Sequence, residues 1–346
     1  MDNQAQSSIL SAIPYPALIL DADFYIKHAN APAANLFEMD MEGLRIVRVS
    51  RQPEILNCVQ NALNTGKIQI ARVVLNLVRP RTYQISAAPF EGLDGTKGSV
   101  LVTYLDVSAE IDAENARSTF VANVSHELRS PLTSLLGVVE TLQGPARNDE
   151  KARDRFLALM HDETQRMSRL VGDLLSLAKL ESKEHVKPKN RVNIERVIKR
   201  VVDSLEASNA DHKDRVQIKT DPDLPEIAGD SDELTEVFQN LLENALKYSS
   251  PETPVDVSIG QKSAIDPSKA GHVFVEIVDQ GDGIAPEHLP RLTERFYRVD
   301  KGRSREMGGT GLGLAITKHI LNRHRGKMSF DSELGEGTTV TIELRI

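Results

Sequence analysis

A histidine, an acid and two hydroxyl side chains stand close together in the stretch Phe120–Val139. Glu127 directly follows His126, and on a helix Ser130 and Thr133 would lie one and two turns beyond the histidine on the same face. A neutral imidazole is a good nucleophile near pH 7, because its ordinary pKa is about 6.5. Glu127 could accept the proton of the other ring nitrogen during attack. The group could perform nucleophilic chemistry at His126, but for this histidine taken alone the alternative is the commoner case, because most exposed histidines are merely solvated.

An amphipathic helix must position this group. Seven apolar residues of the stretch fall within roughly a third of the circumference when the chain is wound at about 100° per residue: Phe120, Val121, Val124, Leu128, Leu132, Leu135 and Val139. His126 lies about 180° from the middle of that stripe, so its ring is expected to face solvent. Pro131 cannot donate to the helix ladder, so a bend is expected one turn after the histidine.

A second helix is expected to pair with the first. Ser108 can cap a helix that runs without glycine or proline into Phe120, and Asn148 and Asp149 can cap another after Gly144. Six apolar residues of this second helix keep steps of three, four or seven: Phe156, Met160, Met167, Leu170, Leu174 and Leu177. A helical hairpin over residues 108–189 would bury its remaining apolar surface in a four-helix bundle with a second copy, which predicts a homodimer.

Three polar residues on a later helix could hold a metal and a phosphate. Asn240, Asn244 and Lys247 are spaced i, i+4 and i+7, on the face opposite the leucines of the same stretch. Amide oxygens can hold a hard cation, and a neighbouring lysine can meet phosphate. Taken alone, two asparagines on a helix are usually solvated surface.

Two glycine-rich segments follow. Asp279–Gly283 comes after an apolar strand, where Gly281 and Gly283 permit a tight turn and close ligand approach, although a plain turn is the commoner explanation. Gly308–Gly313 opens a helix, and backbone amides at such a position suit phosphates. Its GxGxG spacing, without a following Lys-Ser/Thr pair, fits neither a dinucleotide fingerprint nor a P-loop.

A basic segment precedes the second glycine run. Arg295–Arg305 holds five basic residues in eleven. A nucleic-acid patch is the alternative, but the formal charge of −8 for the whole chain and the adjoining glycines favour a mobile lid over phosphate. Nucleic-acid binding is therefore not expected.

Composition limits the class of protein. The 346 residues are enough for two or three domains, and the single cysteine, Cys58, excludes a disulfide framework. No apolar run approaches the ~18 residues of a membrane span, so the expected location is cytoplasmic, with membrane association only through a segment or partner outside this chain.

Short elements are expected on both sides of the hairpin. The first 107 residues should contain Ala17–Leu20, Phe24–His28, Ile68–Val78, Tyr83–Ala88 and Ser99–Leu105 as strands, with helices at Ala31–Phe37 and Pro53–Leu63. Residues 190–346 should contain helices from Asn193, over Asp230–Lys247 and over Gly313–His324, with strands at Val216–Lys219, Val255–Ile259, Val273–Asp279, Lys327–Ser332 and Thr338–Leu344.

The motifs together resemble those of bacterial two-component sensor histidine kinases. Phe120–Thr133 resembles their phosphoacceptor box, and the segments at Asn240, Asp279, Arg295 and Gly308 resemble, in this order, the N, G1, F and G2 boxes of their ATP domain. Gly335–Thr338 resembles its last box, so the resemblance covers residues 118–346. It implies a multidomain α+β protein with a PAS-like α/β sensory domain (1–107), a dimeric helical hairpin (108–189) and an α/β-sandwich ATP-binding domain of the Bergerat, or GHKL, type (190–346).

The resemblance also assigns residues to ATP and Mg²⁺. It implies that Asn240 and Asn244 face Mg²⁺ and phosphate, that Lys247 meets phosphate, and that Tyr248 and Asp279 meet the adenine. The further residues assigned to the nucleotide site are Gly281, Gly283, Arg298, Gly309, Thr310, Gly311, Leu312, Gly313 and Thr338.

The implied function is autophosphorylation of His126 from ATP in a homodimer, followed by transfer to an aspartate of a response regulator. Ser130 stands where the family generally has Thr or Asn, which bears on a possible phosphatase activity. Segments 144–146, 153–157, 166–170 and 184–188 resemble phosphate-regulon sensor kinases, which suggests phosphate-starvation signalling. The alternative is a non-catalytic dimeric scaffold that binds nucleotide and a regulator without turnover.

Overall fold

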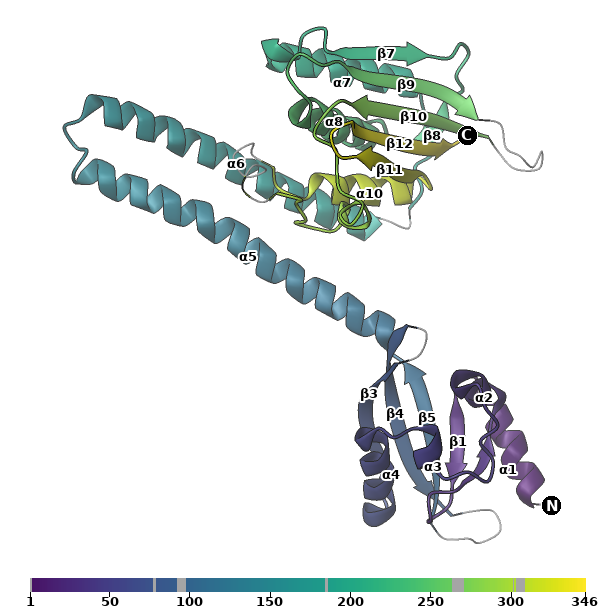
Figure 1. The fold of residues 1–346 in the computed structure, drawn as a ribbon. Coiled ribbons are helices and arrows are strands. Elements are labelled where there is room, and N and C mark those ends of the chain that lie inside the picture. The colour runs from purple at the N-terminus through teal and green to yellow at the C-terminus, as the bar shows by residue number, and fades with distance from the viewer. Residues whose placement is uncertain are drawn as a thin grey trace. The chain divides into compact units, whose positions relative to one another are not determined.

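The computed structural model describes residues 2–76, 79–91, 98–183, 186–262, 271–300, 302 and 309–346. The chain divides into two compact units, Met1–Ala122 and Asn123–Ile346, which are taken separately below (Figure 1).

The first unit is built on one antiparallel sheet of five strands in the order β2-β1-β5-β4-β3. The strands are β1 (Ala17–Leu20), β2 (Ile26–Ala29), β3 (Gln69–Asn76), β4 (Pro80–Phe90) and β5 (Ser99–Asp106). The helices are α1 (Asp2–Ser11), α2 (Ala31–Phe37), α3 (Ile46–Val49) and α4 (Pro53–Thr65). All seven expected elements are confirmed, most of them with shifted ends, whereas α1 and α3 were not predicted from the sequence. The last two residues of the expected strand Ile68–Val78 lie outside the described residues.

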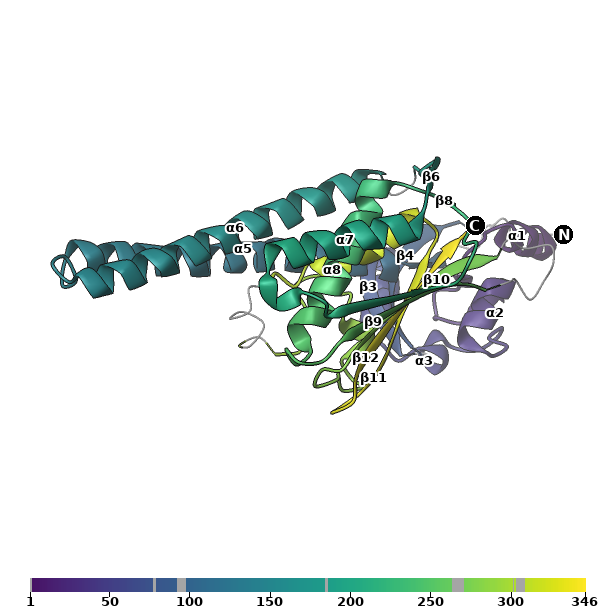
Figure 2. The same cartoon turned by 90° about the horizontal axis from the view of Figure 1, so that it is seen from above.

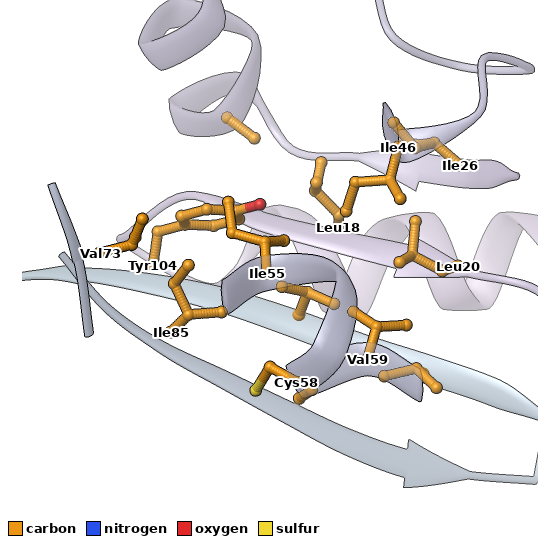
Figure 3. Packing of buried hydrophobic residues seen from close by; sticks show 14 of the residues in the cluster. Leu18, Leu20, Ile26, Ile46, Ile55, Cys58, Val59, Val73, Ile85 and Tyr104 are labelled. Carbon is orange, nitrogen blue, oxygen red and sulfur yellow. The ribbon is translucent and has the colours of Figure 1, made fainter. Parts of the chain in front are cut away.

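The core of this unit lies between the sheet and α4. Leu18, Ile55, Ile85 and Tyr104 are fully buried and point into the same space (Figure 3). Apolar residues at three- and four-residue steps give α4 its buried face, and Gly66 ends the helix in the left-handed region at φ 64°. Along β5 every second side chain is buried, so one face of this strand packs into the core.

Two long helices follow, α5 (Ser108–Gln143) and α6 (Glu150–Lys183). Pro131 lies inside α5 without interrupting it. The expectation that Ser108 caps α5 is wrong: Ser108 is the first helical residue, its N–H donates to Asp106 Oδ1, and its hydroxyl accepts from the Thr82 N–H. The expected cap of α6 is confirmed, because Asp149 Oδ1 accepts from the Ala152 N–H.

The two faces of α5 differ in burial. Pro131 and Val138 are buried, and Glu127 is partly buried beside them. Val121 and Leu132, about 100° further round the helix, are 57% and 52% exposed. The apolar arc is thus wider than the single chain can cover, and the predicted stripe is only half-buried.

The rest of the second unit is an α/β sandwich. Its five-stranded sheet has the order β11-β12-β10-β9-β7, in which β7 and β9 are parallel and all other pairs antiparallel. The strands are β7 (Val216–Thr220), β9 (Val255–Lys262), β10 (His272–Asp279), β11 (Lys327–Glu333) and β12 (Gly337–Arg345). Three helices form one layer against this sheet, α7 (Ile194–Ser208), α8 (Ser231–Tyr248) and α10 (Gly313–Arg323) (Figure 2).

Side-chain caps set the starts of two of these helices. Asn193 accepts from the Arg196 N–H at the start of α7, and Asp230 accepts from the N–H groups of Asp232 and Glu233 at the start of α8. The expected strands and helices of this region are confirmed. The short pair β6 (Asn190–Val192) and β8 (Ile227–Gly229) was not predicted, because three-residue strands carry no periodicity. Among the described helices, none combines the length and the apolarity needed to cross a bilayer.

Candidate phosphoacceptor and nucleotide sites

The side chain of His126 reaches solvent from α5. His126 and Ser130 are both exposed, one turn apart, so the face expected from the helical wheel is confirmed. Glu127 points elsewhere: it is partly buried between α5, α6 and the segment that follows β10. Nucleophile and acid therefore project from adjacent faces of one helix.

Two arginines hold the carboxylate of Glu127. Arg166, on α6, donates from Nη2 to Glu127 Oε2 at 3.0 Å. Arg298, 171 residues further along the chain, donates from Nη2 to the same oxygen at 3.3 Å. Both arginine side chains are at most 10% exposed, so these are buried, charge-assisted bonds rather than surface pairs. The sequence analysis assigned Arg298 to the nucleotide and did not single out Arg166.

The polar face of α8 is as predicted. Asn240, Asn244 and Lys247 are half-buried, whereas Leu241 and Leu246 are buried on the opposite side. A Cβ placed on Gly313 would lie 3.0 Å from Asn240 Oδ1, which puts this amide against the start of α10. The two amides present oxygen donors of the kind that Mg²⁺ accepts, so the residues fit the implied ion. Among the described residues no cluster of three or more His, Cys, Asp or Glu side chains offers a different metal site.

The ammonium group of Lys247 lies in an unfavourable environment for a cation. Burial is the main cause, and the positive charges of Arg298 and Arg169 add to it; together they lower the pKa of Lys247 to about 8. The Nζ atom also lies 5.2 Å from the centre of the Tyr248 ring. A polyanion bound here would remove the penalty on the charged lysine. Tyr248 itself is 37% exposed, at the end of α8.

Asp279 is fixed at the end of β10. It is only 9% exposed, and burial raises the pKa of its carboxyl group although the backbone N–H groups of Gly281 and Thr338 donate to it. Thr338 lies directly opposite Asp279 in the β10–β12 pairing, and it is buried as well. A buried acceptor held by two backbone donors is well suited to read a polar ring edge.

The glycines around Asp279 are required by close backbone contacts. A Cβ on Gly281 would lie 2.5 Å from the carbonyl oxygen of Tyr248. Gly283 has φ +68°, and a Cβ there would lie 2.0 Å from the carbonyl oxygen of Glu333. These two positions bring the loop after β10 against the end of α8 and the β11–β12 turn, so the predicted turn is also a packing site.

The second glycine run is described from Gly309 onward; Gly308 lies outside the described residues. Gly311 has φ +74°, and a Cβ on it would lie 3.0 Å from the backbone of Phe296. Leu312 was assigned to the nucleotide, but its side chain is fully buried and its N–H donates to Thr310 Oγ1, so it contributes to the core. Gly309 and Gly313 are half-buried.

Thr310 and Arg295 contact the hairpin in this structure. The hydroxyl of Thr310 donates to Asp173 Oδ2 at 2.6 Å, and Arg295 forms an ion pair with Glu181, both acids lying on α6. Burial raises the pKa of Asp173, an effect that the Thr310 hydrogen bond partly offsets. The remaining basic residues of the expected lid, Lys301, Arg303 and Arg305, lie outside the described residues. These α6 contacts could not be predicted from the sequence, because they join residues 114 and 137 positions apart.

Two protein families match the chain between residue 116 and its last residue. Residues 116–183 match the His Kinase A (phospho-acceptor) domain, and residues 229–346 match the histidine kinase-, DNA gyrase B-, and HSP90-like ATPase. The sensor histidine kinase WalK of Bacillus subtilis (strain 168) is 38% identical over 247 residues, which are 71% of this chain and 39% of that protein. The sensor protein kinase WalK of Staphylococcus aureus is 38% identical over 243 residues, 69% of this chain and 56% of that protein. The chain spans well under two thirds of the length of these relatives.

The fold likeness extends further along the chain. The crystal structure of histidine kinase ThkA in complex with response regulator protein TrrA aligns with a TM-score of 0.50 and 20% identity, over 98% of this chain and 97% of that one, which shows a common fold. The relatives above carry the name WalK, so they do not support the expected similarity to phosphate-regulon kinases. In its second unit the chain carries the paired phosphoacceptor and ATPase domains of a two-component sensor histidine kinase.

Proposed function

We propose that this chain transfers the γ-phosphoryl group of ATP to His126. The carrying observation is that an exposed histidine on α5 stands next to Glu127, whose carboxylate contacts Arg298 from the ATPase domain. A ring nitrogen of His126 attacks the γ-phosphorus, the bond from phosphorus to the leaving ADP oxygen breaks, and the proton of the other ring nitrogen passes to Glu127. The phosphoimidazole then donates the group to an aspartate of a response regulator.

The nucleotide is held by the site around α8. Asp279 accepts from the adenine edge beside Tyr248, and Lys247 meets phosphate, which fits its burial and lowered pKa. Asn240 and Asn244 hold Mg²⁺, which neutralises phosphate charge when bound. The backbone of the glycine run, from Gly309 to Gly313, lies at the start of α10, where N–H groups suit phosphate oxygens.

The acting form is a homodimer. The half-exposed apolar arc of α5, with Val121 and Leu132 at its outer edge, supports a bundle with a second hairpin. The regulator docks on the same exposed face as His126, so Ser130, one turn away, is placed to orient water for removal of the phosphoryl group from the regulator. A complex of ThkA with its response regulator supports this kind of partner.

The first unit supplies the input. The antiparallel order β2-β1-β5-β4-β3, with helices between β2 and β3, supports a PAS-like sensory domain, and a single residue, Val107, separates β5 from α5. The alternative is a domain that only dimerises. The suggestion that the input is phosphate starvation rests only on the four short segments that resemble phosphate-regulon kinases. Residues 184–185 of the last of these segments lie outside the described residues.

The rival function is a scaffold that binds nucleotide without turnover. Incubation of the chain with Mg²⁺ and γ-labelled ATP separates the two, since phosphohistidine is acid-labile and base-stable. We expect such label on the wild type and none on His126→Gln, which should still bind nucleotide because the acceptor and the ATP site lie in different domains.

Asn244→Ala is the corresponding loss-of-function variant in the ATPase domain. It should remove both Mg²⁺-dependent nucleotide binding and labelling. A wild-type chain that binds ATP but carries no label supports the scaffold, and unchanged affinity in Asn244→Ala would show that the assignment of α8 is wrong.

A further inference from the structure

Arg166 crosses the hairpin from α6 to the acid beside the phosphoacceptor histidine. Its Nη2 donates to Glu127 Oε2 at 3.0 Å, and its Nη1 donates to Glu163 Oε1 at 3.0 Å. The residue is 8% exposed, which is rare for an arginine without a specific role. A planar guanidinium tied at both ends by carboxylates has one orientation, so Arg166 can fix Glu127 in turn.

The second cation on Glu127 comes from a different domain. Arg298 meets the same oxygen, Oε2, at 3.3 Å, but it belongs to the segment between β10 and α10 that the family resemblance assigns to the nucleotide site. An arginine that turns toward phosphate gives up its bond to Glu127. Arg166 belongs to the hairpin itself, so its bond to Glu127 does not depend on where Arg298 turns.

We propose that Arg166 is a positioning residue for phosphoryl acceptance: it anchors the Glu127 carboxylate on the face of α5 adjacent to His126, with or without Arg298, and so limits the rotamers from which Glu127 can accept the His126 proton. The inference rests on the proposed function. Neighbouring residues on a helix do not face each other, so Glu127 reaches the ring only in a restricted set of rotamers. Loss of Arg166 frees that side chain, and it also leaves a buried carboxylate with one cation fewer.

The test compares rates of acid-labile labelling at saturating Mg²⁺-ATP in the full chain. Arg166→Met should lower the rate at least tenfold while the KM for ATP stays within about twofold, because the hydrogen bonds of Arg166 within the described residues go to Glu127 and Glu163 and not to the α8 site. The labelling rate of Arg166→Lys should lie between those of the wild type and Arg166→Met, since lysine keeps the positive charge but loses the planar guanidinium group that bonds two carboxylates. Arg155→Met, an exposed arginine on the same helix, is the matched control and should label at the wild-type rate.

A double-substitution cycle separates positioning from a merely structural role. If Arg166 acts through Glu127, the chain carrying both Glu127→Gln and Arg166→Met labels within about twofold of Glu127→Gln alone. If the fold reductions in labelling rate of the two single variants multiply in the double variant, Arg166 only supports the fold and the inference is overturned. The same cycle with Arg166→Lys decides the matter if the methionine variant does not fold.

Two outcomes keep this inference apart from the proposed function. A wild type that labels normally, together with an Arg166→Met variant that labels at the same rate, overturns only the role of Arg166. A wild type without acid-labile label overturns both. Glu163→Gln, which leaves the Arg166–Glu127 bond in place, should slow labelling by less than about threefold; a larger fall than in Arg166→Met would also count against the inference.

Discussion

Helices α8 and α5 are both amphipathic, but only α8 has its apolar face buried within a single chain. The apolar side of α8 is buried against its own domain, with Leu241, Leu242 and Leu246 at most 3% exposed. On α5, Val121 and Leu132 are more than half exposed. The helix that carries the proposed metal and phosphate ligands is thus positioned by its own domain, whereas the helix that carries His126 depends on what covers its outer face.

The glycines show the same difference. At glycines near the proposed nucleotide site an added Cβ would collide with backbone atoms, as at Gly283, where it would lie 2.0 Å from a carbonyl oxygen. A Cβ on Gly137 of α5 or Gly172 of α6 would meet nothing within 4 Å. The nucleotide site is therefore a close-packed structure with little tolerance, and the hairpin has room for change. Four experiments test this difference between the two regions.

The largest effect is expected at Gly283. Gly283→Ala places a side chain at φ +68° and against the Glu333 carbonyl group, so the free energy of unfolding of the ATPase domain should fall by about 3 kcal/mol, with loss of nucleotide binding. Gly137→Ala, in the middle of α5, should instead stabilise the chain by up to ~1 kcal/mol. Denaturant unfolding and calorimetric ATP titration measure both; equal effects at the two positions would refute the contrast.

The next effect concerns the exposed arc of α5. Leu132→Glu should weaken the dimer by roughly 100-fold, about 2.7 kcal/mol, because a charge would have to be buried in the bundle. Ser134→Glu adds the same charge to an exposed polar position on the same helix and should leave association unchanged. Sedimentation over a range of concentrations gives both constants. A Leu132→Glu chain that dimerises like the wild type would mean that another surface holds the dimer.

A smaller effect follows from the pKa of Lys247. Because burial and the neighbouring arginines lower the pKa of Lys247 to about 8, the lysine is mostly neutral at pH 9 and must take up a proton to meet phosphate. ATP affinity should therefore fall about tenfold between pH 7 and pH 9, with proton uptake detectable by calorimetry in buffers of different ionisation enthalpy.

Two variants control for other titrating groups. Lys247→Met should bind ATP more weakly at pH 7 and lose this part of the pH dependence. Lys219→Met, which changes an exposed lysine of β7, should keep the wild-type profile. A Lys247→Met profile parallel to that of the wild type would assign the proton to another group.

The smallest effect is expected at Ser130. A serine can hold an attacking water as a threonine can, but without the γ-methyl group its χ1 is less restricted. Ser130→Thr should raise dephosphorylation of the phospho-regulator and change autophosphorylation by less than about threefold, roughly 0.6 kcal/mol of barrier. The assay is loss of label from purified phospho-regulator with ADP present, and Ser130→Ala acting as fast as wild type would exclude the role.

Much of the fold could be predicted because the evidence for it is local. The bounds of α2 were predicted to the residue, since Asn30 caps the helix and Pro32 fits its first turn. The polar face of α8 and the exposure of His126 follow from the 3.6-residue period alone. The glycine turn at Asp279 was also recognisable, but its reason, contact with Tyr248 and Glu333 across the domain, was not.

Local sequence pattern was enough to predict which residues share a helix face or a turn, and so the positions of His126, Asn240, Asn244 and Asp279 on their elements. Only the tertiary structure decided the partners of Glu127, since Arg166 and Arg298 lie 39 and 171 residues away from it. Periodicity fixes where a side chain points on its own element, because that depends on backbone geometry over a few residues. Which charge it then meets depends on how distant elements pack, and no short pattern records that.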